Sequence, residues 1–144
     1  MSAAFWLRIA AVWGFLAISM GAFGAHGLED RFTTVGSASG GLSPERLKAN
    51  FNTAAQYHMY CALAILAVGI LAQFGRGGAA LQAAGWLFLV GSLIFSGSLY
   101  ILATTGLRWL GAITPIGGVA MIAAWVALAV AAGSFGFEGN KTLP

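Results

Sequence analysis

Apolar residues dominate the chain in four long blocks, which short polar segments separate. Every one of the 11 charged residues lies outside these blocks, which are residues 9–28, 49–75, 77–107 and 109–137. About 20 apolar residues are enough for one helix to cross the hydrocarbon core of a bilayer. The pattern therefore predicts four membrane-spanning helices. We place them at approximately residues 5–28, 53–74, 79–103 and 112–135.

The first span has a competing interpretation as a secretory signal peptide, because the small residues at 21–25 resemble a cleavage site. A signal peptide carries basic residues ahead of an apolar core of about 7–15 residues. Here Arg8 follows an apolar start, and the apolar stretch is too long. The pattern favours a membrane helix.

The connection between the first two spans carries most of the charge. The chain is expected to leave the membrane at residues 29–31 and to pass through a Gly/Ser-rich turn region at residues 35–42. Ser43 and Pro44 then indicate a helix start, because a hydroxyl caps free N–H groups and proline suits the first helical position. We interpret residues 44–52 as a short amphipathic lead-in at the membrane interface, which continues into the second span.

The other connections, at residues 75–78 and 104–111, are short. Short connections make helices that follow one another in sequence antiparallel neighbours. We therefore predict an all-α, up-down-up-down bundle in which residues 1–144 form a single integral membrane domain. Four basic residues on one side against three on the other leave its orientation open.

The composition excludes several classes of protein. Charged residues make up 8% of the chain and hydrophobic residues 59%, whereas soluble domains carry about 25% charged residues. A soluble globular enzyme is therefore excluded. The net charge of +3 is scattered, so no basic patch indicates nucleic-acid binding. The single cysteine, Cys61, excludes an internal disulfide and a multi-cysteine zinc site.

Small residues repeat along the spans at helical spacing. Ala17, Gly21 and Ala25 recur every four residues in the first span. Helices in lipid associate through close packing, which small residues allow. The pattern indicates packing within the bundle. The alternative is a face that serves a homo-oligomer or a larger membrane complex.

Most polar side chains of the spans are predicted to gather in one leaflet, in what we call the polar cluster. The cluster comprises His26, Gln56, Tyr57, His58, Cys61, Ser96, Ser98, Tyr100 and Thr114. His26 lies three residues before Glu29 and His58 about five residues into the second span, so the two histidines are expected to be level. Ionisable groups at membrane depth are candidate functional residues. They are also commonly satisfied in place by local hydrogen bonds.

No pattern of catalytic or metal-binding residues accompanies the cluster. No carboxylate lies within a span, so an acid–base pair is not formed there. Two histidines and one cysteine lack a fixed ligand spacing, so we predict no metal and no cofactor.

Four motifs, one in each span, resemble one family. They are Gly-Ala-Phe-Gly-Ala-His-Gly-Leu at 21–28, Tyr-His-Met-Tyr at 57–60, Phe-Ser-Gly-Ser-Leu-Tyr at 95–100 and Leu-Gly-Ala-Ile-Thr-Pro-Ile-Gly-Gly at 110–118. The chain resembles the small four-helix membrane proteins of domain-of-unknown-function family 423, which are related to mitochondrial transmembrane protein 256. The resemblance implies a bacterial inner-membrane protein without an established reaction. Relatives commonly have histidine where this chain has Cys61.

Two functions follow from these observations. The first is a structural or accessory membrane protein that packs with partners or with itself, without enzymatic activity. The alternative is an oligomeric binding or transport module that holds a small amphipathic molecule, lipid headgroup or ion at the polar cluster. The missing carboxylates and the small soluble portion favour the first.

Overall fold

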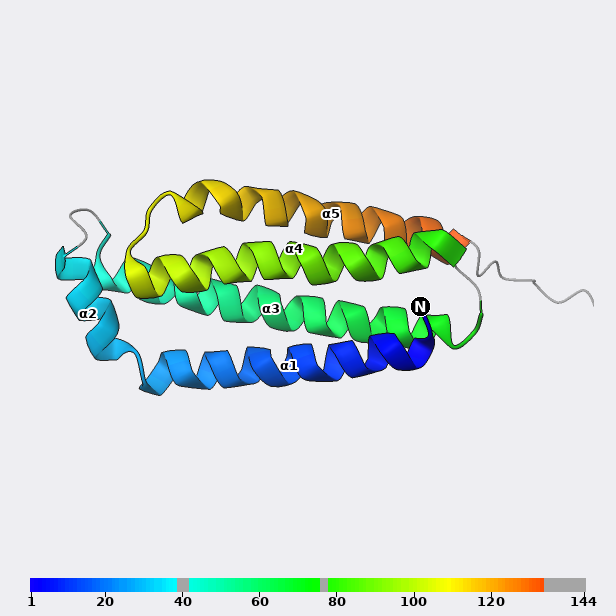
Figure 1. The fold of residues 1–144 in the computed structure, drawn as a ribbon, viewed down its shortest axis with the longest axis horizontal. Helices are drawn as coiled ribbons and strands as arrows, with labels where there is room; N and C mark the ends of the chain where they lie inside the picture. Colours follow the sequence, from blue (N-terminus) through cyan, green and yellow to red (C-terminus); the bar gives the residue numbers. More distant parts are fainter. Residues whose placement is uncertain (39–41, 76–77, 134–144) are drawn as a thin grey trace, which may run out of the picture.

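The described residues, 1–38, 42–75 and 78–133, form five α-helices and no β-strand in this computed structural model. Four are long and apolar enough to cross a membrane. They are α1 (Ala3–His26), α3 (Pro44–Ala72), α4 (Gly78–Thr105) and α5 (Leu110–Gly133). Each runs antiparallel to the long helix before it (Figure 1). The predicted all-α, four-span bundle is confirmed. Residues 76–77 of the second connection and residues 134–135 of the fourth span lie outside the described residues.

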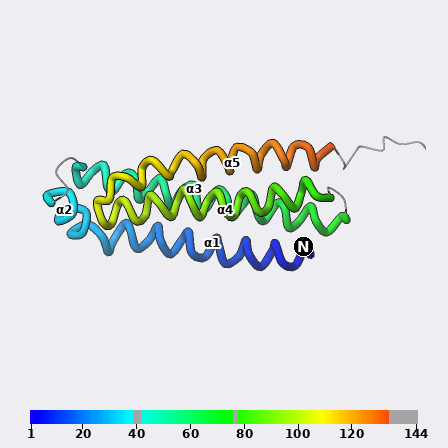
Figure 2. Tube along the Cα trace, turned by 45° about the horizontal axis from the view of Figure 1, so that its top comes forward, coloured from blue at the N-terminus to red at the C-terminus, as the bar shows by residue number. Residues whose placement is uncertain are grey.

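The helices α3 and α4 form the centre of the bundle, and α1 and α5 lie at opposite edges (Figures 1 and 2). In their most apolar windows, 44% of the residues of α3 and of α4 are buried, against 17% for α1 and 22% for α5. Large apolar side chains such as Phe15 and Val126 are exposed on the edge helices. In a bilayer these surfaces contact lipid, so their exposure is compatible with a stable fold.

The short helix α2 (Glu29–Ala38) corrects the expected loop, because residues 35–38 are helical where a turn region was predicted. Glu29 and Asp30 occupy its first turn, where carboxylates interact favourably with the helix dipole. Phe32 and Val35 of α2 are buried against the rest of the bundle. We call this end of the bundle, where the charged residues at 29–31 and 45–48 lie, the charged end. Residues 39–41 of the predicted turn region lie outside the described residues.

The start of α3 has the capping serine and the first-position proline that the sequence predicts. Ser43 caps the helix by accepting a hydrogen bond from the backbone N–H of Arg46 at 3.3 Å, and Pro44 is the first helical residue. The neighbouring backbone N–H of Glu45 and the Ser43 hydroxyl favour the charged carboxylate of Glu45 and lower its pKa. Leu47 and Phe51 of the lead-in are fully buried. The apolar side of the lead-in therefore packs into the bundle.

Candidate functional site

The two histidines lie at different depths, so the prediction that they are level is wrong. His26 is exposed at the end of α1. Close to it, Gly24 faces the ring of Phe51 in the lead-in of α3. His58 is seven residues beyond Phe51, or about 10 Å further along α3. The reason is that Gly24 has no side chain, which lets the lead-in pack beside the end of α1.

His58 is buried at the meeting point of three helices. Its Nδ1 atom lies 3.4 Å from the hydroxyl of Tyr100 on α4. Its ring packs edge-to-face on Trp13 of α1, with 5.0 Å between ring centroids. The ring of Tyr100 also contacts the ring of Phe51, with 4.8 Å between ring centroids. Among the described residues, the buried His58 Nε2 and Ser96 Oγ atoms have no hydrogen-bond partner.

A second polar pair joins α4 to α5. The hydroxyls of Ser98 and Thr114 are 2.8 Å apart and both residues are buried. Each hydroxyl also lies within bonding distance of a backbone carbonyl of its own helix, Phe95 for Ser98 and Leu110 for Thr114. This arrangement satisfies both hydroxyls at membrane depth without water.

The remaining members of the polar cluster are on α3. The Cys61 thiol lies 3.2 Å from the sulfur of Met121 and links α3 to α5 across the core. Gln56 is exposed and donates from Nε2 to the Tyr60 hydroxyl of its own helix at 2.7 Å. Tyr57 is exposed and contacts Tyr60 and Phe95. The structure therefore brings together His58 with Tyr100 and Ser98 with Thr114, and leaves His26 and Gln56 outside these contacts.

Two polar contacts involve residues outside the polar cluster, one beside His58 and one toward the other end of the bundle. The indole N–H of Trp13 donates to Ser92 Oγ at 2.9 Å, and that of Trp6 donates to Gln82 Oε1 at 3.0 Å. Both bonds join α1 to α4. Ser92 and Gln82 are isolated polar residues in an apolar span, and this isolation is the sequence feature from which the two bonds could have been predicted. Polar residues are thus less concentrated in one leaflet than predicted.

We expect the Ser98–Thr114 pair to stabilise the bundle modestly and as a unit. Interhelical hydrogen bonds in membranes contribute about 1 kcal/mol. Ser98→Ala and Thr114→Ala are each expected to lower the free energy of unfolding by about that amount, and the double variant by little more than either. Unfolding by SDS in mixed micelles, followed by circular dichroism, measures these values. Strictly additive losses would show that the hydroxyls act independently.

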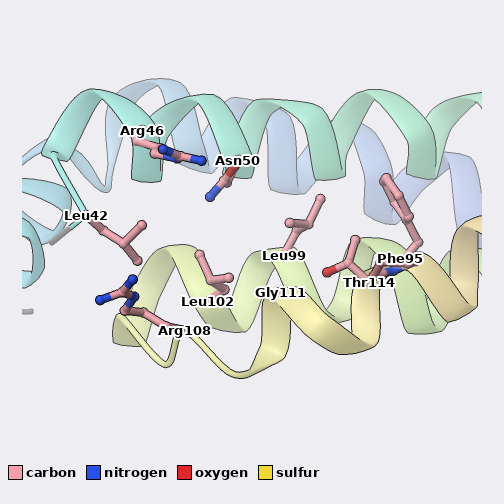
Figure 3. A pocket seen from close by; sticks show the side chains of 10 residues that line it. Leu42, Arg46, Asn50, Phe95, Leu99, Leu102, Arg108, Gly111 and Thr114 are labelled. Atoms are coloured by element: carbon pink, nitrogen blue, oxygen red, sulfur yellow. The ribbon is translucent and has the colours of Figure 1, made fainter.

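A cavity of about 450 Å³ opens beside the polar cluster, between α3, α4 and the start of α5. Arg46 and Asn50 of α3 and Arg108 of the α4–α5 connection line it, together with Thr114 of the polar cluster (Figure 3). The sequence indicates only that the two arginines lie on the same side of the membrane. No group of three or more potential metal ligands occurs in the part of the chain that the structure describes.

The family model described as "Protein of unknown function (DUF423)" matches residues 20–118, more than half of the chain. The chain belongs to the DUF423 family. The match spans α2, α3 and α4 and includes all nine residues of the polar cluster. The resemblance inferred from the four motifs is therefore confirmed.

Bacterial relatives of this DUF423 chain carry the name UPF0382 membrane protein. YwdK of Bacillus subtilis is 44% identical over 124 residues, which cover 86% of this chain and 92% of the relative. A protein of Staphylococcus epidermidis is 41% identical over 116 residues, 81% of this chain and 84% of the relative. SSP2132 of Staphylococcus saprophyticus is 44% identical over 115 residues, which cover 80% of this chain and 85% of the relative. No solved structure matches the chain significantly. Integral membrane localisation, predicted from the four spans, is confirmed by these names.

Proposed function

We propose that this DUF423 protein is a non-catalytic structural or accessory component of the membrane, which acts by packing with itself or with other membrane proteins. The observation that carries the proposal is the pairing of buried polar groups across helix interfaces. His58 with Tyr100, and Ser98 with Thr114, make contacts that hold α3, α4 and α5 together. These groups serve the fold of the bundle.

The distribution of carboxylates supports a non-catalytic role. Glu29, Asp30 and Glu45 all lie at the charged end of the bundle, outside the four uncharged blocks of the sequence. Glu29 forms an ion pair with Lys48 at 3.1 Å. General acid–base catalysis needs a proton-transferring side chain within reach of a bound substrate. His58 is enclosed by Trp13 and Tyr100, which does not favour that role.

The alternative, a ligand held by the polar cluster itself, is less well supported. It requires His26 and His58 to face one site, but His26 is exposed at the end of α1 and His58 is buried deeper in the bundle. The geometry favours the accessory role.

Native mass spectrometry of the protein, extracted from its own membranes in a mild detergent, tests the proposal. The expected result is a complex of fixed stoichiometry, either of several copies of the chain or of the chain with other polypeptides. A protein that emerges only as a monomer under conditions that preserve known membrane complexes would contradict the proposal.

A matched pair of histidine variants tests whether the buried contacts serve the fold. His58→Ala removes the contacts to Tyr100 and Trp13, and we expect it to lower the free energy of unfolding by about 2 kcal/mol. His26→Ala changes an exposed side chain and is expected to stay within about 0.5 kcal/mol of wild type. Unfolding in mixed micelles measures both values. Equal effects would argue against a structural role for His58.

A further inference from the structure

Two neighbouring cavities lie between α3 and α5, beside α4. The cavity at Arg46 and Arg108 has a volume of about 450 Å³, and the second, nearer the middle of the bundle, has a volume of about 620 Å³. Phe95 of α4 lines both cavities, so they adjoin at this residue. We call the two cavities together the amphipathic groove.

The outer end of the amphipathic groove carries basic and amide side chains. Arg46 and Asn50 enter it from α3, and Arg108 enters it from the opposite side (Figure 3). Both arginines are exposed, and within the described residues neither forms an ion pair. No carboxylate lines this cavity. Two guanidinium groups and one amide therefore present hydrogen-bond donors that match the oxygens of a phosphate.

The inner end is apolar and is hollow because small residues form part of its walls. Ala64 and Ala67 of α3 and Gly118 of α5 are among the residues that line it, together with Trp125. From Tyr57, where the apolar part begins on α3, to Ala67 is ten residues, or about 15 Å along the helix. That length is about half of the hydrocarbon thickness of a bilayer, which is the depth of one leaflet.

We propose that the amphipathic groove binds one anionic phospholipid, with its phosphate at Arg46 and Arg108 and an acyl chain along the apolar part. The order of the two ends fits a lipid, because the cationic end is at the membrane surface and the apolar end is at acyl-chain depth. An apolar segment from a second copy fits less well, because none of the four uncharged blocks of this chain carries a carboxylate to meet the arginines. The inference is independent of the proposed accessory function.

Lipid titration of the delipidated full-length protein, followed by native mass spectrometry, tests the charged end. Palmitoyl-oleoyl phosphatidylglycerol is the anionic probe, and phosphatidylcholine with the same chains is the zwitterionic control. We expect a one-to-one adduct that favours phosphatidylglycerol. Basic residues at a membrane surface each contribute about fivefold to the affinity for anionic lipid, so Arg46→Gln and Arg108→Gln should each weaken phosphatidylglycerol binding about fivefold. Phosphatidylcholine binding should be unchanged.

Arg31→Gln is the matched control for general attraction to the charged end. Arg31 is at the same end of the bundle, but its Nε atom donates to the Thr104 carbonyl and it does not line the groove. We expect this variant to bind phosphatidylglycerol as wild type does. An effect equal to that of Arg46→Gln would overturn the proposal, because the arginines would then act only through net charge.

Ala67→Phe tests the apolar part by filling it. The variant is expected to weaken binding of both lipids about tenfold, whereas Ala123→Phe, on the exposed outer side of α5, should weaken neither. Circular dichroism and gel filtration check that each variant is folded. Equal affinity of wild type for the two lipids, or a dimer that Ala67→Phe dissociates while lipid binding is unchanged, would overturn the proposal.

Discussion

Gly117→Ala is expected to lower the free energy of unfolding by about 3 kcal/mol, because there is no room for a side chain at this position. A Cβ atom at Gly117 would lie 2.5 Å from the backbone nitrogen of Phe95 and 2.6 Å from the carbonyl oxygen of Gly91. Both atoms belong to the backbone of α4, so neither is able to rotate away as a flexible side chain does. The two helices would have to separate along their interface.

Gly118→Ala is the matched control for this prediction. Its new Cβ atom would lie 3.8 Å from the ring of Phe95, which is an ordinary van der Waals contact. Both substitutions remove a glycine from the same turn of α5, so their intrinsic effects on the helix are equal. Unfolding by SDS in mixed micelles, followed by circular dichroism, compares them. A loss at Gly118 as large as that at Gly117 would refute the close-packing explanation.

The close approach of α4 and α5 also shows how far small-residue patterns can be interpreted from sequence. Gly91 and Gly117 face each other, as packing within the bundle requires. In α1, Ala17 is buried, whereas Ala25 at the end of the predicted ladder is exposed. Gly24, which is not part of the ladder, approaches α3 more closely than the ladder residue Gly21 does. A spacing of four residues drifts around a helix of 3.6 residues per turn, so the ladder leaves the interface.

The number and order of the spans were predictable because 20 or more uncharged residues leave few alternatives to a membrane helix. The helix α2 was missed because its Gly and Ser residues are common in turns, while its helical signals are weak individually. Phe32 and Val35 are three residues apart, which is helical spacing, and the buried contacts that they make become visible only in the fold. Local sequence gave too little evidence for a helix of 10 residues.

The placement of the polar cluster depended on the register between α1 and α3, and sequence alone does not define that register. A connection that leaves the membrane and returns is compatible with several offsets between the two helices. Close packing of Gly24 against Phe51 selects one of them and moves His58 toward Trp13. Likewise, the cavity between Arg46 and Arg108 depends on how α3 and the α4–α5 connection approach each other in space.

Trp6→Ala is expected to lower the free energy of unfolding by about 3–5 kcal/mol, the range found when a fully buried tryptophan is truncated. The Trp6 side chain is 0% exposed. Its ring packs edge-to-face on Trp86, with 5.4 Å between ring centroids, and fills the space beside Gly85. In lipid the loss arises from missing van der Waals contacts and a cavity, because apolar surface is not transferred to water.

Two further variants separate the contributions of Trp6. Trp6→Phe keeps an aromatic ring but removes the indole N–H that donates to Gln82, and we expect a loss of about 1 kcal/mol. Trp109→Ala truncates a tryptophan that is 61% exposed and is expected to change stability by less than about 0.5 kcal/mol. If Trp6→Ala were as mild as Trp109→Ala, α1 would be held mainly by α3. The Trp6–Gln82 bond would then contribute little to the attachment of this edge helix to α4.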